Sequence, residues 1–240
     1  MLQGFLELVE RDCVALWWYN MLKKPAVDLA SFAEPYFAEL ESYYRKENRK
    51  IWVLDVTSDL GIPAFAAVSG KGERNGRVIF GLGCHFDAKL AVQRAMTEMN
   101  QSLSIVKQAF DEDNSADLDF WYSEAVDWWK TATCENQPYM APGKDLPTKR
   151  YTDYPKPRSE DLLENILICR KIVEDRGMEM LVLDQTRPDI GVNVAKVIVP
   201  GLRHFWARFA LCRLYDVPVQ MGWLPKPLKE EELNPIPLFF

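Results

Sequence analysis

Apolar side chains recur at helical spacing in two long stretches of the chain, which predict its two principal helices. In residues 1–21 they form one stripe at Leu2, Phe5, Leu6, Val9, Cys13, Leu16 and Trp17. In residues 87–110 the stripe is Val92, Met96, Met99, Leu103, Val106 and Phe110. Steps of three and four indicate that one side of each helix faces the core. Asp87 stands where an N-cap accepts from the first free backbone N–H groups of the second helix.

Shorter patterns predict the remaining elements. A helix capped by Asp28 or Ser31 is expected to reach about residue 47, and buried strands are expected at residues 52–57, 64–68 and 78–82. Two further helices are predicted at about residues 116–131 and 159–177. In the second of these, Ser159 is the expected cap, Leu162, Leu163 and Ile166 begin the core stripe, and Gly177 follows the end.

An internal repeat relates two parts of the chain. VLDVTSDLGIPAFAAV at residues 53–68 and VLDQTRPDIGVNVAKV at residues 182–197 share a strand, a turn and a second strand. Asp55 and Asp184 hold equivalent positions, which favours turn-capping over catalysis for both. We therefore predict one α/β domain over residues 1–240, with a mixed or antiparallel sheet and helices on one face. Two related strand-pair-plus-helix units, at about residues 50–110 and 160–215, would build it.

Polar side chains flank the apolar stripe in both principal helices. Glu7, Glu10 and Arg11 lie at i, i+3 and i+4, and Arg94, Glu98 and Gln101 repeat a spacing of four and three. If the helices pack side by side, Glu7, Glu10, Glu98 and Gln101 converge. Hard oxygen ligands of this kind suit Mg²⁺ better than zinc. The alternative is that each set forms a surface ion-pair ladder.

These stretches resemble the YcaO family. ELVERD at residues 7–12, preceded by Gln3 and Gly4, is similar to its ExxER element, and GLGCHFD followed by RAMTEMNQ at residues 94–101 is similar to its ExxQ-bearing element. The resemblance continues through LDVTSDLGIPAFAAVS, VPGLRHFWARF and RLYDVPV into NPIPLFF at the end. It therefore covers nearly the whole chain and is more specific than any single motif.

The resemblance implies a nucleotide and metal site. Members of the family bind ATP and Mg²⁺ and activate backbone amides of peptides. The expected metal ligands are Glu7, Glu10 and Glu98, and the expected nucleotide contacts in the same elements are Arg11, Asp87, Arg94 and Gln101. Pro235 and Pro237 match part of a proline-rich tail that enters the active site of cyclodehydratases, so they are the expected catalytic-tail residues.

Three arginines near the end of the chain are a second candidate for phosphate contacts. Arg203, Arg208 and Arg213 are the densest arginine group, and the forked guanidinium suits phosphate. Structural ion pairing with the excess acid is the alternative reading. His204, in the same segment, is expected to pack at the edge of the core.

Composition narrows the possible partners. The chain has 240 residues, 48% of them hydrophobic, and a net charge of −6, so it can bury a full core and has no basic field for nucleic acid or an anionic membrane. Five cysteines without a CxxC pair favour reduced thiols, hence a cytoplasmic protein. Glu7, Glu10 and Arg11 interrupt the first apolar stretch, which is typical of neither a signal peptide nor a membrane span.

The function expected from the resemblance is an ATP- and Mg²⁺-dependent cyclodehydratase that forms azolines from Cys, Ser or Thr of a ribosomally made precursor peptide. The alternatives are a thioamide-forming enzyme, a ribosomal-protein modification factor, or a non-catalytic peptide-binding scaffold subunit. Expected partners are the precursor peptide, an E1-like leader-peptide-binding protein, a flavin-dependent azoline dehydrogenase and a second copy in a homodimer. We further expect this chain to be the C-terminal portion of a longer enzyme, because family members carry a segment before the ExxER element.

Overall fold

A three-stranded antiparallel sheet forms the centre of the molecule. The computed structural model describes residues 1–72, 76–109, 123–155 and 159–239. Strands β1 (Arg49–Asp55), β2 (Ala64–Lys71) and β3 (Gly76–Cys84) are hydrogen-bonded in the order β1-β2-β3. Leu54 pairs with Ala66, and Ala66 pairs with Leu82. The central strand β2 is buried from Ala64 through Gly70, so both sheet faces are covered along it.

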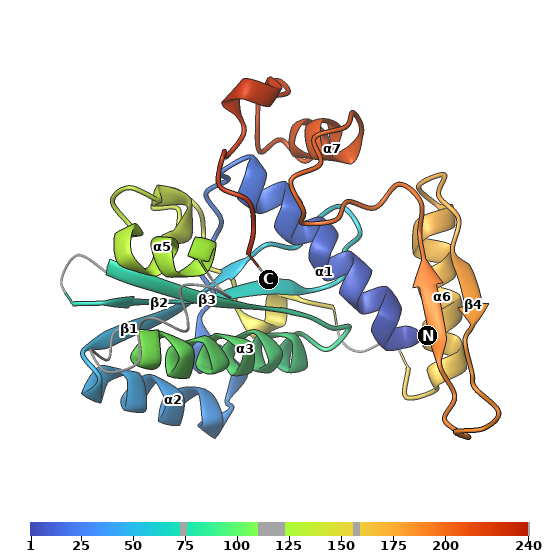
Figure 1. Cartoon of the computed structure of the whole chain (residues 1–240), viewed down its shortest axis with the longest axis horizontal. Helices are drawn as coiled ribbons and strands as arrows, with labels where there is room; N and C mark the ends of the chain where they lie inside the picture. Colours follow the sequence, from blue (N-terminus) through green and yellow to red (C-terminus); the bar gives the residue numbers. More distant parts are fainter. Residues whose placement is uncertain (73–75, 110–122, 156–158, 240) are drawn as a thin grey trace.

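Helices cover both faces of this sheet. Helices α2 (Pro35–Lys46) and α3 (Ala88–Ala109) lie on one face, and α1 (Leu2–Tyr19) and α5 (Ser123–Thr131) lie on the other (Figure 1). The predicted α/β class with an antiparallel sheet is confirmed, but the expectation that helices cover one face alone is wrong. The uninterrupted apolar run of β2 is the physical reason, since a strand with only one covered face normally alternates apolar and polar side chains.

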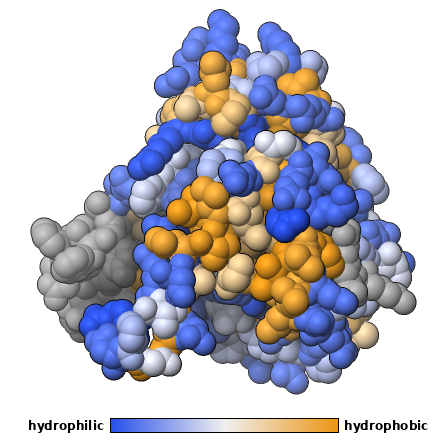
Figure 2. Space-filling model, turned by 90° about the vertical axis from the view of Figure 1, so that its right-hand side faces the viewer, coloured by the Kyte–Doolittle hydropathy of each residue, from blue (hydrophilic) through white to orange (hydrophobic). Residues whose placement is uncertain are grey.

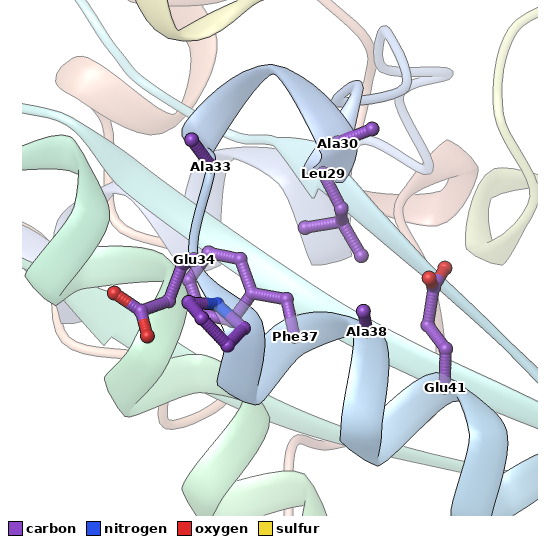
Figure 3. Close-up of a pocket in the computed structure, with 8 residues that line it drawn as sticks. Leu29, Ala30, Ala33, Glu34, Phe37, Ala38 and Glu41 are labelled. Atoms are coloured by element: carbon purple, nitrogen blue, oxygen red, sulfur yellow. The ribbon is translucent and has the colours of Figure 1, made fainter.

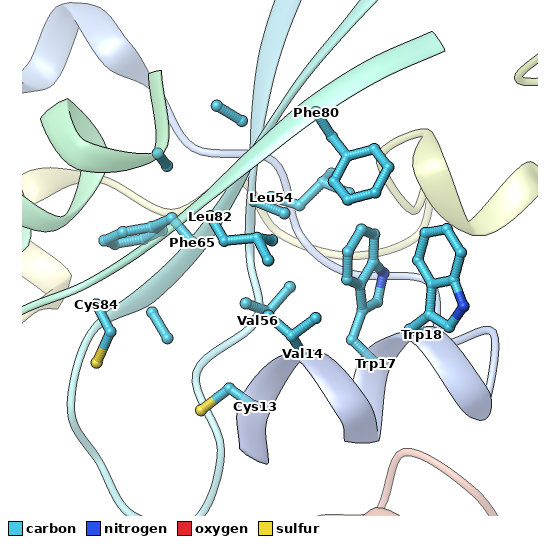
Figure 4. Packing of buried hydrophobic residues seen from close by; sticks show 14 of the residues in the cluster. Cys13, Val14, Trp17, Trp18, Leu54, Val56, Phe65, Phe80, Leu82 and Cys84 are labelled. Atoms are coloured by element: carbon cyan, nitrogen blue, oxygen red, sulfur yellow. The ribbon is translucent and has the colours of Figure 1, made fainter. Parts of the chain in front are cut away.

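The α1 face of the sheet is packed mainly by aromatic rings. Trp18 contacts Phe80 of β3 at 5.4 Å and Trp128 of α5 at 5.0 Å between ring centroids. Figure 4 shows Trp17 and Trp18 projecting from α1 toward Leu54 and Phe80. This packing fixes α1 against the edge strand β3.

Two glycines let α3 approach the opposite face closely. A Cβ added at Gly81 would lie 2.0 Å from the backbone N of Met99, and one added at Gly83 would lie 2.2 Å from the backbone O of Ala91. No side chain fits in such a space. These two glycines of β3 therefore set the distance between β3 and α3.

The predicted helix beginning at Asp28 or Ser31 is broken in the structure. A short 3₁₀ turn spans Leu29–Phe32, and α2 starts only at Pro35, with the Glu34 carboxylate accepting from the Tyr36 N–H at 3.5 Å. Proline disfavours helical backbone in the residue before it, and Glu34 is extended. The cap is therefore Glu34, not the residues expected from the sequence.

A second, smaller unit stands beside the amino-terminal half of α1. Helix α6 (Leu162–Glu174) is followed by an antiparallel pair, β4 (Leu181–Asp184) and β5 (Ala195–Ile198). Asp161 caps α6 by accepting from the Leu163 N–H at 2.7 Å, so the expected cap Ser159 is wrong. Asp55 and Asp184 each accept from the N–H two residues on, at 3.0 and 2.9 Å, which agrees with the turn-capping reading.

The outer surface of this unit is apolar. Leu162 and Leu163, expected in the core, are 66% and 62% exposed, because α6 packs inward through Cys169, Ile172 and Val173 instead. Figure 2 shows apolar side chains gathered on this side of the molecule. The exposed apolar residues of the unit are Leu162, Leu163, Leu167, Leu181, Val182, Leu183, Ile190, Val192, Val194 and Ile198.

The remaining predictions for the elements fall into two groups. The strands at residues 52–57, 64–68 and 78–82 and the helix over 87–110 correspond to β1, β2, β3 and α3 within a few residues, and Gly177 follows α6 with a positive φ of 70°. Phe110 and the first part of the helix expected over 116–131 lie outside the described residues. Helix α7 (Arg213–Gln220) is the last α-helix in the described ranges. No helix in the described ranges is long and apolar enough to cross a bilayer.

Candidate functional site

The structure brings together four polar side chains that the sequence singled out. Glu7 and Glu10 from α1 and Glu98 and Gln101 from α3 line two adjoining hollows of about 530 and about 400 Å³. We call these hollows together the carboxylate cavity. Leu82 of β3 also lines both, and Arg94 and Arg11 line one each.

The carboxylate cavity lies at the outer edge of β3. Helices α1 and α3 cover opposite faces of the sheet, so their side chains can meet only around the edge strand. Glu98 marks this edge, because its carboxylate accepts a hydrogen bond from the backbone N–H of Leu82 at 3.1 Å. The edge position explains how polar residues on two helices share one cavity.

Negative charge in the carboxylate cavity lacks a full counterion. Burial, followed by the charges of Glu98 and Glu7, raises the pKa of Glu10 to about 8, although Arg94 and Arg11 oppose the rise. Burial also raises the pKa of Glu98 to about 7, against the hydrogen bond from Leu82. Within the described ranges neither carboxylate has a cation at ion-pair distance, whereas Glu7 pairs with Arg11 at 3.3 Å. A bound cation would lower the cost of ionising Glu10 and Glu98.

The donor set is suitable for a hard divalent cation. It consists of carboxylate and amide oxygens, and Mg²⁺ takes one or two carboxylates while keeping waters and substrate phosphates as further ligands. Among the described residues no group of three or more His, Cys, Asp or Glu side chains is arranged to hold a metal by itself. Glu7 is turned toward Arg11 and Gln3 rather than into a shared cluster. An open site completed by water and phosphate is consistent with both observations.

Two arginines and Asp87 were expected to contact the nucleotide along with Gln101. Arg94 donates to the Cys84 carbonyl at 3.2 Å and lines the carboxylate cavity, and Arg11 lines it beside Glu7. Asp87 accepts from the Lys89 N–H at 2.8 Å, as an N-cap does, and it is absent from the cavity lining. Arg11 and Arg94 are therefore the two positive charges at the cavity, and Asp87 serves α3.

Arg213 forms a buried ion pair instead of facing the cavity. Its guanidinium donates to both oxygens of Asp12, at 2.9 and 2.6 Å, and to both oxygens of Asp59, at 3.1 and 2.7 Å. Burial alone would lower the pKa of Arg213, but its hydrogen bonds to Asp12 and Asp59 raise it instead. All three nitrogens of the guanidinium donate to these two carboxylates. Arg213 is therefore engaged in structural ion pairing, the alternative to a phosphate contact.

Asp12 is a residue that the sequence reasoning missed. It has no exposed surface, and besides Arg213 it accepts from the Arg203 backbone N–H at 2.8 Å. Burial raises the pKa of Asp12, and the hydrogen bonds from Arg213 and Arg203 oppose that rise. The sequence does show an acid directly before Cys13 of the apolar stripe. Because buried acids are rarely left without a partner, this position indicates that Asp12 has one.

The other arginines expected at the phosphate also lie elsewhere. Neither Arg203 nor Arg208 lines the carboxylate cavity. The Nε of Arg203 is buried without a hydrogen-bond partner, and the guanidinium of Arg208 lies 5.1 Å from the centroid of the Trp206 ring. The His204 ring packs against Phe205 in a tilted contact, with 4.7 Å between centroids, in line with its expected packing role.

The proline-containing tail runs along the second half of α1. The Trp18 indole donates to the Ile236 carbonyl at 2.7 Å, and the backbone N–H of Asn234 donates to the Tyr19 carbonyl at 2.8 Å. Pro235 and Pro237 flank Ile236 and are absent from the lining of the carboxylate cavity. The tail is thus ordered, but in this arrangement its prolines do not reach the carboxylates.

A further hollow on the α2 side offers a useful contrast. It has about 370 Å³ and lies at the start of α2, where Figure 3 shows Leu29, Phe37 and Ala38 together with Glu34 and Glu41. Its lining holds no basic side chain and its two acids are on separate turns. It is therefore poorly suited to a phosphate or a metal–phosphate complex.

Comparison with known proteins identifies the family of this chain. The model of the family described as "YcaO cyclodehydratase, ATP- and Mg²⁺-binding" matches residues 1–203, and the chain belongs to the YcaO family. A heterocyclase solved in complex with substrate and cofactor is 50% identical, with a TM-score of 0.89 over the whole of this chain and 31% of that one. The heterocyclase TruD is 49% identical, with a TM-score of 0.87 over the whole of this chain and 32% of that one.

More distant relatives extend the comparison. YcaO from Methanopyrus kandleri, bound with AMPPCP and Mg²⁺, has the same fold at a TM-score of 0.62, with 20% identity over 85% of this chain and 51% of that one. An uncharacterised protein in the tfuA 3′ region of Rhizobium leguminosarum bv. trifolii is 30% identical over 84% of this chain and 49% of its own length. The chain thus spans about half the length of its curated relatives and about a third of the two heterocyclase chains.

Proposed function

We propose that this chain holds Mg²⁺-ATP for an ATP-dependent cyclodehydratase that acts on backbone amides of a peptide. The observation that carries the proposal is the carboxylate cavity, where Glu7, Glu10, Glu98 and Gln101 meet at the edge of β3 with incomplete neutralisation of charge. Membership in the YcaO family and the likeness to two heterocyclases support it.

The chemistry of such a reaction assigns the protein a positioning role. A Cys, Ser or Thr side chain of the peptide loses its proton and adds to the carbon of the preceding amide carbonyl, and the oxygen of that carbonyl accepts the γ-phosphoryl group of ATP, which releases ADP. That oxygen then leaves as phosphate, and loss of the amide N–H proton completes the C=N bond of the azoline. Bound Mg²⁺ would offset the charge of the phosphates. Glu10 and Glu98 would hold the ion, Glu7 would join after leaving Arg11, and Gln101 would supply an amide oxygen.

The two cavity arginines have a distinct part in this proposal. Arg94 is held by the Cys84 carbonyl and Arg11 lies between Glu7 and His204, so each presents a guanidinium near the carboxylates. Guanidinium groups bind phosphate oxygens in a forked geometry. Arg11 would change partners from Glu7 to a phosphate as Glu7 turns toward the ion.

Calorimetry with the variant Glu98→Ala tests the proposal. We expect ATP affinity to fall at least tenfold in Mg²⁺, because a ligand of the bridging ion is lost, and to stay unchanged in EDTA. Glu179→Ala removes an exposed acid outside the cavity and is the matched control. Equal loss in both buffers would refute the metal-ligand role. Absence of Mg²⁺-dependent binding to the unmodified chain would favour the scaffold alternative instead.

A further inference from the structure

A second polar cavity lies at the opposite end of α1. It has about 760 Å³ and is bounded by three segments, residues 20–25, 143–149 and 221–224, with Asp55, Thr57 and Ser58 also in its lining. We call it the Lys24 cavity. It shares no lining residue with the carboxylate cavity. Ten residues separate Glu10 from Asn20, which corresponds to about 15 Å along a helix axis.

Lys24 places a buried amino group in the lining of this cavity. The residue is only 3% exposed, and its Nζ lies over the Trp223 ring at 2.9 Å from the centroid. In the part of the chain that the structure describes, no carboxylate lies within ion-pair distance of this Nζ. Burial lowers the pKa of Lys24 to about 7, although the charge of Asp55 opposes the fall. Its backbone carbonyl accepts from the Gly143 N–H at 2.9 Å, which holds Lys24 in place.

Asn20, which also lines this cavity, has an unused hydrogen-bond acceptor. It is 4% exposed, and its amide nitrogen donates to the carbonyls of Leu16 and Leu214 at 3.1 and 3.0 Å. Its Oδ1 is buried without a donor. Buried acceptors are normally satisfied, since leaving one unpaired costs about 1–3 kcal/mol. A ligand with an N–H group would remove this cost.

The lining of the Lys24 cavity also contains further basic side chains and apolar surface. Lys23, Lys144 and Lys149 join Lys24 in the lining, against the acids Asp55 and Asp145. This basic excess stands out in a chain of net charge −6. Leu22, Leu146 and Leu224 supply apolar wall between the charged groups. The cavity is therefore complementary to a negatively charged ligand that also carries an apolar group.

We propose that the Lys24 cavity binds a short acidic peptide segment with an apolar side chain. A carboxylate of the peptide pairs with the Lys24 ammonium over the Trp223 ring, a backbone N–H donates to Asn20 Oδ1, and the apolar side chain lies against Leu22 and Leu146. A peptide supplies all three groups within a few residues. The proposal does not depend on nucleotide binding, because the two cavities have no residue in common.

Fluorescence anisotropy tests the proposal directly. The probe is a fluorescein-labelled pentapeptide with leucine at its centre, glutamate on each side and alanine at both ends, and the control peptide replaces both glutamates by glutamines. We expect the acidic peptide to bind at least tenfold more tightly, and Lys24→Met to remove that preference. Lys171→Met, on the exposed side of α6, is the matched control and leaves binding unchanged. Equal affinity for the two peptides would overturn the proposal.

A second measurement uses the unmodified protein in case Lys24→Met does not fold. The acidic pentapeptide, with a benzophenone on its terminal alanine, is photo-crosslinked and the labelled residues are mapped by mass spectrometry. We expect labels in residues 143–149 or 221–224, suppressed by excess acidic peptide and not by the glutamine peptide. Labelling confined to α3, or labelling that excess acidic peptide does not suppress, would refute binding in the Lys24 cavity.

Discussion

Two acids within one turn of α1, Asp12 and Glu10, show how differently the same chemical group is used. Asp12 has no exposed surface and accepts three hydrogen bonds, two from Arg213 and one from the Arg203 backbone. Glu10 is less buried, yet within the described ranges it has no counterion at ion-pair distance, and Glu7 and Glu98 stand near it. The difference in partners, not in burial, separates a structural carboxylate from a candidate metal ligand.

Their positions on the helix explain the contrast. Two residues correspond to about 200° around a helix, so the side chains leave α1 on nearly opposite sides. Asp12 points to the buried side, where Arg213 of α7 and Asp59 complete a network. Glu10 points to the edge of β3, where the charges of Glu98 and Glu7 lie near it. We expect substitutions to separate the two roles in the following order of effect.

Breaking the Asp12 pair should have the largest effect on stability. We expect Asp12→Ala to lower the free energy of unfolding by about 3–5 kcal/mol, because Arg213 would stay buried with half of its partners gone. Urea denaturation followed by circular dichroism measures the change. Asp189→Ala, which removes an exposed pair with Arg187, is the control and should cost less than about 1 kcal/mol. A loss at Asp12 no larger than this control would contradict the structural role.

Neutralising Glu10 should have a smaller effect of the opposite sign. Its pKa is raised from 4.5 to about 8, so in metal-free buffer the folded protein holds a proton that the unfolded chain releases in this window. Stability of the unmodified protein therefore falls as pH rises from 4.5 to 8 and levels off above. We expect Glu10→Gln to be more stable by about 1–2 kcal/mol at pH 9, with no gain at pH 4. Denaturation curves in EDTA measure the difference in stability between the variant and the unmodified protein. A difference that does not change with pH would contradict a raised pKa of Glu10.

Removing Glu7 should have the smallest effect. Glu7 is exposed and its pair with Arg11, at 3.3 Å, is open to solvent. We expect Glu7→Gln to change the free energy of unfolding by less than about 0.5 kcal/mol at any pH between 5 and 9. Thermal denaturation across that range checks this value. A pH-dependent gain in stability as large as that of Glu10→Gln would contradict this prediction. It would show that the Glu7 carboxylate, like that of Glu10, is destabilised when ionised in the metal-free protein.

The residues of the carboxylate cavity could be predicted from the sequence, whereas the buried network of Asp12 and Arg213 could not. Glu7, Glu10, Glu98 and Gln101 each flank a helical stripe, so the local period indicates their side of the helix. The partner of Asp12 is 201 residues away in the chain, and nothing in the local pattern of α7 shows whether Arg213 meets an acid or a phosphate. Long-range partner choice is a property of packing, which periodicity does not report.

Other departures have equally specific causes. The continuous apolar run of β2 was evidence for two covered faces, but it does not say which helix lies on which face. Leu162 and Leu163 follow the helical period of α6 and are nevertheless exposed, because period identifies an apolar side and not its partner. The Lys24 cavity is built from three loops, so no periodic pattern predicts it.

The close contact of β3 with α3 also limits how this chain can diverge. A methyl group at Gly81 or Gly83 would push α3 outward, since main-chain atoms of that helix leave it no room. Leu82 lies between these glycines, and its N–H holds the Glu98 carboxylate. Homologues that keep Glu98 in place must therefore keep glycine at two positions that do not line the carboxylate cavity. A homologue with alanine at position 81 or 83 is therefore expected to have lost the geometry of the carboxylate cavity.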